Sequence, residues 1–271
     1  MQWWQALILG CVQGLTEFLP VSSSGHLQIT EHLFGLKMVP LAFDIWLHLG
    51  TLLAVLIYFR EQIRSMTWKM LSKIGLASLP IFIGGFVFMD YIIQLRTDLS
   101  ALIITYAISA VVLFLADSIL RSNKGESIKF KLMEKIHQRL TNKYPPSLTQ
   151  ALLIGLFQVI AILPGVSRSG ITVSAGIFTG LPRDQVFSFA FLISLPAIIG
   201  AIVLNVIQLL TGDSAVGIAV LPWSVYLLGV TASAIVGWLA LSILRWFIDQ
   251  RILWPFAIYS ALVSILLVLF V

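Results

Sequence analysis

The chain has 271 residues, of which 59% are hydrophobic and only 11% are charged, and its formal net charge is +5. A soluble domain has about a quarter of its residues charged, so this composition excludes a soluble globular protein and indicates a chain that lies in a lipid bilayer. We expect no nucleic-acid partner, because the basic residues fall between apolar stretches, where the membrane surface explains them. The single cysteine, Cys11, excludes an intramolecular disulfide and a thiolate metal cluster.

The first segment, 2–33, is too interrupted to form an ordinary membrane span. Its first apolar run contains Gln13 and Glu17, and a proline and a polar stretch that includes Ser22 follow before a second short apolar arm. Because no basic residue precedes the run, we expect no cleaved signal peptide. Runs this short predict a re-entrant helical hairpin, whose irregular tip must be buried in protein or line a hydrated cavity.

Three apolar runs of about 20 residues, the length that crosses a bilayer, follow this hairpin. They predict spans at 42–59, 74–94 and 100–120. The basic segment 121–147 is then expected to be a cytoplasmic linker with an amphipathic helix near 127–140. The rest of the chain predicts a second hairpin at 148–179 and three further spans at 186–211, 222–244 and 253–271.

The two predicted hairpins are copies of one another. Residues 5–25 align without gaps on 150–170, at an offset of 145, with nine identities in 21 positions. Since three spans follow each copy, the second half must sit inverted in the membrane relative to the first. The sequence therefore predicts an all-α integral membrane protein with six transmembrane helices and two re-entrant helical hairpins, arranged as two inverted-topology repeats, 1–120 and 148–271.

The basic residues predict the orientation of these repeats. If the loops 60–73, 121–147, 180–185 and 245–252 are cytoplasmic, they contain 14 of the 17 Lys and Arg residues. The positive-inside rule favours this arrangement, which places both termini outside the cytoplasm. Arg168 is the basic residue that it leaves at membrane depth.

The two hairpin tips carry the chemistry that we consider functional. A carboxylate at bilayer depth costs roughly 2.5–3.5 kcal/mol, so Glu17 is expected to have a partner or a function, and Gln13 shares its helix face. The Arg168 guanidinium has a planar fork suited to a phosphate, and it lies between Ser167 and Ser169. Two interpretations remain open for Glu17 and Arg168: an ion pair that holds the hairpins together, or a functional pair.

Hydroxyls and an imidazole complete the first tip, which reads Ser22-Ser23-Ser24-Gly25-His26. Together with a carboxylate and an anion-binding arginine, these groups are typical of a phosphoryl-transfer site. Asp44 and His48, four residues apart at the start of the next span, are expected to form either a second layer around that site or a structural pair.

Two motifs, one in each hairpin, resemble those of a known family. Gln13-x-x-x-Glu17 fits (Glu/Gln)-x-x-x-Glu, and residues 164–172 fit Pro-Gly-x-Ser-Arg-Ser-x-x-Thr in full. The chain resembles, over essentially its whole length, the bacterial undecaprenyl-diphosphate phosphatases of the bacitracin-resistance type. The resemblance implies an inner-membrane hydrolase that recycles the lipid carrier of cell-wall polymers, with a divalent metal, Mg²⁺ or Ca²⁺, and a site open to the periplasm. It is compatible with a homodimer.

The resemblance also implies roles for individual residues. Catalysis is assigned to Glu17, Ser23, His26 and Arg168, and metal binding to Glu17 with Gln13. Whether Ser23 attacks phosphorus or His26 activates a water is left open, with Ser23 attack preferred. The diphosphate is expected to contact Ser22, Ser24, Gly25, Ser167, Ser169, Gly170 and Thr172.

Three other functions share some of these sequence features. Inverted repeats with broken hairpins are typical of transporters, so a flippase of undecaprenyl phosphate is the alternative. An ion channel is disfavoured because one Arg and one Glu do not make a conduction path. The type 2 phosphatidic-acid phosphatase class is excluded because the sequence has no Arg-Pro dipeptide and no histidine after His137.

Overall fold

The computed structural model describes residues 1–36, 39–95, 98–122, 146–211 and 221–270. Within these ranges every regular element is helical, so the predicted all-α class is confirmed. The first half contains α1 (Trp3–Phe18), α2 (Ser23–Leu33), α3 (Leu41–Tyr58), α4 (Arg60–Arg64), α5 (Trp68–Val87), α6 (Met89–Leu95) and α7 (Leu99–Ser122). The second contains α9 (Leu148–Gln158), the 3-10 helix η2 (Val159–Ile162), α10 (Arg168–Phe178), α11 (Arg183–Leu192), α12 (Ser194–Thr211), α13 (Trp223–Asp249) and α14 (Trp254–Phe270). The expected linker helix, 127–140, lies outside the described residues.

The chain is a multi-pass membrane protein. By length and composition, four of its described helical stretches can cross a bilayer, namely Trp68–Val87, Leu99–Ser122, Arg183–Ile207 and Trp223–Asp249. Shorter apolar helices occupy Ala42–Tyr58, Leu148–Ile162 and Trp254–Leu269. Two expected spans are broken: a turn at Phe88 separates α5 from α6, and a turn at Ile193 separates α11 from α12. At the second break, Pro196 has no N–H with which to continue the hydrogen-bond ladder of α11.

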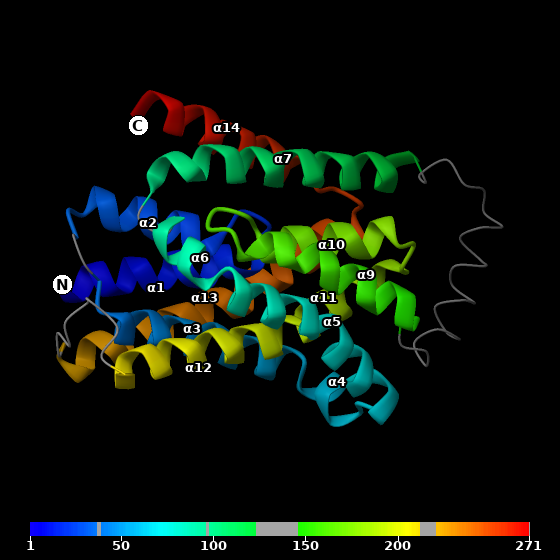
Figure 1. Ribbon diagram of the computed structural model, residues 1–271, viewed down its shortest axis with the longest axis horizontal. Coiled ribbons are helices and arrows are strands. Elements are labelled where there is room, and N and C mark those ends of the chain that lie inside the picture. The colour runs from blue at the N-terminus through cyan, green and yellow to red at the C-terminus, as the bar shows by residue number, and fades with distance from the viewer. Residues whose placement is uncertain (37–38, 96–97, 123–145, 212–220, 271) are drawn as a thin grey trace.

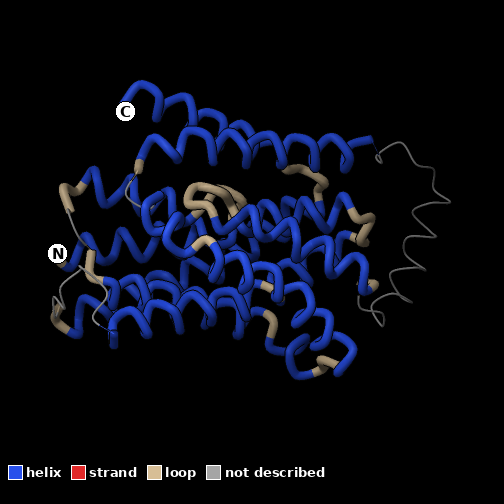
Figure 2. Tube along the Cα trace, viewed as in Figure 1, coloured by secondary structure: helices blue, strands red, loops and turns tan. Residues whose placement is uncertain are grey.

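Two short hairpins enter the helix bundle from opposite ends. In Figure 1, α1 runs inward from the end that carries the N-terminus and α2 returns to it, whereas α9 enters from the other end and α10 returns there. Figure 2 shows loop segments in the middle of the bundle, where these hairpins turn. The chain reversals 19–22 and 163–167 are thereby brought to the same depth.

Each hairpin packs against a long helix of the other half. On α1, a Cβ added to Gly10 would lie 2.5 Å from the carbonyl oxygen of Gly229 on α13. On α9, Gly155 holds the position that corresponds to Gly10, and a Cβ there would overlap the backbone of Ala77 on α5. Lipid is as apolar as leucine, so such close backbone contacts, rather than water exclusion, stabilise helix pairs in a membrane. The two halves are therefore interlocked.

The first tip is fixed from the inside by aromatic packing. The side chains of Phe18, Phe59, Phe187 and Phe191 are almost completely buried. Phe18 contacts Phe191 edge to face, with ring centroids 5.8 Å apart, and Phe191 stacks on Phe59. This cluster joins the end of α1 to α3 and α11, and so holds the residues beside Phe18 in place.

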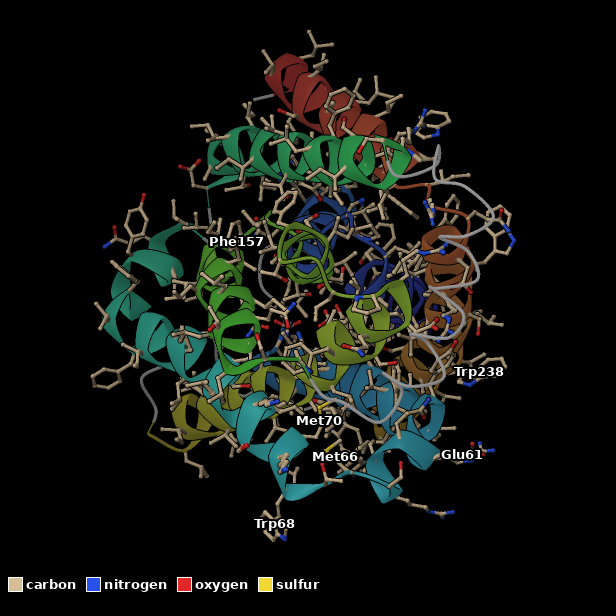
Figure 3. The ribbon with its side chains drawn as sticks, turned by 90° about the vertical axis from the view of Figure 1, so that its right-hand side faces the viewer. Glu61, Met66, Trp68, Met70, Phe157 and Trp238 are labelled. Carbon is tan, nitrogen blue, oxygen red and sulfur yellow. The ribbon has the colours of Figure 1, made fainter. Side chains whose placement is uncertain are left out.

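The described basic residues, Arg168 excepted, lie at one end of the bundle. They occur in α4, at the start of α5, at the end of α7, at the start of α11 and at the end of α13. Figure 1 shows these helix ends together on the right, opposite both chain termini. Figure 3 looks along the helices from this end, where Trp68, with 86% of its surface exposed, points away from the bundle.

Candidate active site

The two tips share one local structure, and their sequences are the ones that align in the predicted repeat. Ser22 caps α2, and its Oγ accepts a hydrogen bond of 3.4 Å from the Gly25 N–H. Ser167 caps α10 in the same way, accepting from the Gly170 N–H at 3.1 Å. Both inner arms therefore begin at the tips, and their N-termini, which carry partial positive charge, favour an anion between them.

Direct contacts join the tips. The Gly165 N–H donates to Ser24 Oγ at 3.3 Å, and Ser169 Oγ donates to the Leu19 carbonyl oxygen at 3.1 Å. Gly165 has φ +89°, and a Cβ on it would overlap Thr105 of α7. Only glycine fits this turn without strain, because φ is in the left-handed region and no space is left for a side chain.

Glu17 lies at the centre of the contact between the tips. Its Oε2 accepts hydrogen bonds from Ser23 Oγ at 2.6 Å and from Gln13 Nε2 at 3.1 Å. Its Oε1 accepts from Arg168 Nη2 at 2.9 Å. The carboxylate is thus charge-compensated in a buried place, and the Ser23 hydroxyl proton already points at a base.

Arg168 joins the tips through one terminal nitrogen, and its other terminal nitrogen has no hydrogen-bond partner in the described structure. Nη2 makes the ion pair with Glu17, while Nη1 is buried and has no hydrogen-bond partner within the described structure. A buried donor without a partner costs about 1–3 kcal/mol, so it is expected to serve a ligand. The ion-pair interpretation of Arg168 and the anion-binding interpretation are therefore compatible in one geometry.

A cavity of about 270 Å³ opens beside these groups. Its polar wall contains Glu17, Ser22, Ser23, Ser24, Ser167 and Arg168. Every one of these residues comes from the two tips or the helix turns next to them. The structure therefore brings together three of the four residues to which we assign catalysis.

His26, the fourth, does not line this cavity. Its Nδ1 lies 2.7 Å from the Ser22 carbonyl oxygen and 2.8 Å from Tyr106 Oη, and its Nε2 lies 2.6 Å from Tyr259 Oη. Its ring also stacks on the Tyr259 ring at an interplanar angle of 11°. The imidazole thus attaches the first tip to α7 and α14.

The remaining expected residues lie behind the polar wall. Gln13 is fully buried beneath Glu17, and Gly25 packs under the Tyr106 ring. Thr172 Oγ1 donates to the Arg168 carbonyl oxygen at 2.9 Å. Ser169 bonds across to the first tip, and Gly170 forms the helix cap described above. None of these remaining residues is among those that line the cavity.

The cavity is also lined by two polar residues from outside the sequence motifs, His48 and Asn205. His48 lines the cavity from α3, and its Nδ1 lies 2.8 Å from the Asp44 carbonyl oxygen. Asn205 lines it from α12 and is buried. In the sequence, the indication that Asn205 has a function is that it is an amide in an otherwise apolar run. For His48, the only indication is its four-residue spacing from Asp44.

Comparison with known proteins identifies the family of this chain. A family model described as bacitracin resistance protein BacA matches residues 6–266. A protein of Carboxydothermus hydrogenoformans named undecaprenyl-diphosphatase is 38% identical over 245 residues, which cover 89% of this chain and 86% of the relative. Proteins of the same name from Trichlorobacter lovleyi and Alteromonas mediterranea are 35% and 34% identical, over 96% and 100% of this chain and 94% and 99% of their own lengths. The chain belongs to the bacitracin resistance protein BacA family.

Proposed function

We propose that this protein hydrolyses undecaprenyl diphosphate to undecaprenyl phosphate and inorganic phosphate. Membership of the BacA family supports the activity, as do the names of relatives that match almost end to end. The observation that carries the assignment of residues is the 2.6 Å hydrogen bond from Ser23 Oγ to Glu17 Oε2 beside the unpartnered Arg168 Nη1. A hydroxyl, a carboxylate and a guanidinium thus line one cavity, which supports their proposed roles as nucleophile, base and anion-binding group.

The diphosphate binds between the two tips. Arg168 Nη1 donates to a terminal phosphate oxygen, and the hydroxyls of Ser22, Ser24 and Ser167 surround the same space. The N-termini of α2 and α10 add partial positive charge. This charge stabilises the transition state of phosphoryl transfer, in which negative charge spreads over the equatorial oxygens.

In the first step, Ser23 Oγ attacks the terminal phosphorus. The Oγ–P bond forms while the bond from phosphorus to the bridging oxygen breaks, and undecaprenyl phosphate leaves with the electron pair. The serine proton passes to Glu17 Oε2, which already accepts it as a hydrogen bond.

In the second step, a water attacks the phosphoserine. The new O–P bond forms as the P–Oγ bond breaks, and Glu17 returns its proton to Ser23 Oγ. Both protons of the water leave with the inorganic phosphate, as H₂PO₄⁻, so that Ser23 and Glu17 regain their starting states.

A divalent metal, Mg²⁺ or Ca²⁺, is part of the proposal. Gln13 Oε1 is buried without a hydrogen-bond partner in the described structure, and Glu17 is the acidic residue of the cavity wall. The described residues contain no cluster of three His, Cys, Asp or Glu side chains that could hold a metal ion. This set fits Mg²⁺, which takes most of its ligands from substrate phosphates and water. Glu17 and Gln13 would hold the ion, which supplies further positive charge to the phosphates.

The site is proposed to face the periplasm across the inner membrane, in a chain of six spans and two re-entrant hairpins. The described basic residues other than Arg168 gather at the end opposite both termini, and the positive-inside rule favours a cytoplasmic location for that end. The first hairpin, which supplies Glu17 and Ser23, then enters from the periplasmic side.

Transport of undecaprenyl phosphate is the second candidate. It is favoured by the two oppositely inserted hairpins, an arrangement found in transporters. However, moving an anion requires no hydroxyl held against a buried carboxylate. Proteoliposomes distinguish the two functions: a flippase moves labelled undecaprenyl phosphate between leaflets without releasing phosphate.

The direct test is phosphate release from undecaprenyl diphosphate by purified protein in detergent with Mg²⁺, with a chelator control. We expect Ser23→Ala to lower kcat by on the order of 10³-fold or more, because the nucleophile is lost. Ser118→Ala, which removes an exposed hydroxyl that bonds only its own helix, is the matched control and should retain activity. Wild-type protein that releases no phosphate would refute the proposed activity.

A further inference from the structure

The cavity at the tips continues into a second, apolar part. This part lies between α5, α6 and α12, and Ile81, Phe82, Gly85, Ile92, Ala197 and Gly200 are among its walls. The polar tip residues and these apolar residues line one continuous cavity. A ligand with a charged head and a hydrocarbon tail would thus find both environments in one space.

The apolar part is bordered by exposed apolar side chains of α5 and α12. Phe82 of α5 and Leu204 of α12 both line the cavity, and 42% and 38% of their surfaces are exposed. The neighbouring residues Ile83 and Val203 are exposed at 62% and 49%. Because these surfaces are apolar and lie in membrane helices, the cavity opens towards lipid on this side.

Small residues create this space. A Cβ added to Gly85 would have no other atom within 4 Å, so the α5 wall is open at that position. At Gly200 of α12 a Cβ would overlap the Phe82 ring, which therefore lies directly against the α12 backbone. We call this apolar part of the cavity, between α5 and α12, the slot. Gly85 leaves the slot open, and the contact between Phe82 and Gly200 limits its width.

We propose that the slot between α5 and α12 binds the first isoprene units of the substrate and leads the rest of the chain into the bilayer. The inference rests on the proposed function. We expect the isoprenoid chain as the occupant because the polar and apolar parts form one cavity. When Arg168 holds the diphosphate, the attached chain leaves the tips where the apolar part of the cavity begins. Each CH₂ group of the chain that is buried in the slot makes dispersion contacts with its apolar walls, and these contacts favour binding.

The test is to fill the slot without distorting the fold. Gly85→Leu places a side chain in open space on the cavity wall, and Gly75→Leu is the matched control. Gly75 lies on the same helix, also has no atom within 4 Å of an added Cβ, is exposed and does not line the cavity. The measurement is the ratio of kcat/KM for undecaprenyl diphosphate to kcat/KM for dimethylallyl diphosphate, which has a single isoprene unit.

We expect Gly85→Leu to lower this ratio by about tenfold or more, because the long chain loses its path while the headgroup site remains. Gly75→Leu should leave the ratio unchanged. If Gly85→Leu is active and has the same ratio of kcat/KM values as the wild-type protein, the slot does not bind the isoprenoid chain. That result would leave the proposed function unaffected. Inactive wild-type protein would instead refute the proposed function.

A second measurement locates the chain without any substitution. A polyprenyl diphosphate with a diazirine in its second isoprene unit should label peptides of α5 and α12 on irradiation. Labelling confined to other helices would overturn the inference.

Discussion

The two terminal nitrogens of the Arg168 guanidinium have different surroundings, and Arg168→Lys tests whether they have separate roles. Nη2 makes the 2.9 Å bond to Glu17, whereas Nη1 is buried and has no partner in the described structure. Lysine keeps the positive charge but offers one compact ammonium in place of a planar fork. If the ammonium pairs with Glu17, the donor for the phosphate is lost.

The loss can be estimated from that one donor. A hydrogen bond to a charged group contributes about 1.5–3 kcal/mol, and each 1.36 kcal/mol changes a rate tenfold. We therefore expect Arg168→Lys to lower kcat/KM for undecaprenyl diphosphate by about 10- to 150-fold. Thermal unfolding should change little, because an ion pair to Glu17 can still form.

The assay is phosphate release at several substrate concentrations, together with a melting curve of the detergent-solubilised protein. Arg60→Lys is the matched control, since the Arg60 side chain is 62% exposed and lies 3.8 Å from Glu61. Activity of Arg168→Lys within twofold of wild type would refute the separate role of Nη1. A strongly lowered melting temperature would show that the pair mainly holds the hairpins together.

Three other predictions concern the fold and the role of the tips. Gly155→Leu should lower the free energy of unfolding by about 1–3 kcal/mol or more, because α9 could no longer approach α5, whereas Gly75→Leu should not; equal melting temperatures would contradict the interlocked packing. His26→Phe should lower the melting temperature and kcat together, since the ring attaches the tip to α7 and α14; lost activity at unchanged stability would instead indicate a direct part in the chemistry. After removal of the native cysteine, His32→Cys should react with an impermeant maleimide on intact cells and Ser65→Cys only after permeabilisation; the reverse pattern would invert the orientation.

The local structure of the hairpins was predictable because it depends on nearby residues. A polar, proline-containing interruption in a short apolar run predicts a tip, and the repeat relates Ser22 to Ser167 as helix caps. The association of Glu17 with Arg168 followed from the cost of leaving either charge alone at membrane depth.

The packing partners of each hairpin could not be predicted in the same way. Gly10 and Gly155 indicate a close approach, but a glycine does not specify which backbone it meets. The positions of the histidine side chains could not be predicted from sequence spacing either. His26 is only three residues from Ser23, but its ring contacts the Ser22 carbonyl oxygen instead of lining the cavity. His48 lines the cavity through the packing of α3, which no local spacing encodes.

The stereochemical course at phosphorus tests the central claim most directly. The substrate is undecaprenyl diphosphate with a terminal thiophosphoryl group made chiral by ¹⁶O and ¹⁸O, and the reaction is run in H₂¹⁷O. The inorganic thiophosphate that is released bears sulfur and three oxygen isotopes, and its configuration counts the displacements. Attack by Ser23 followed by water is two in-line displacements, so we predict overall retention. Overall inversion would mean that water attacks directly, and it would contradict a nucleophilic Ser23 held by Glu17.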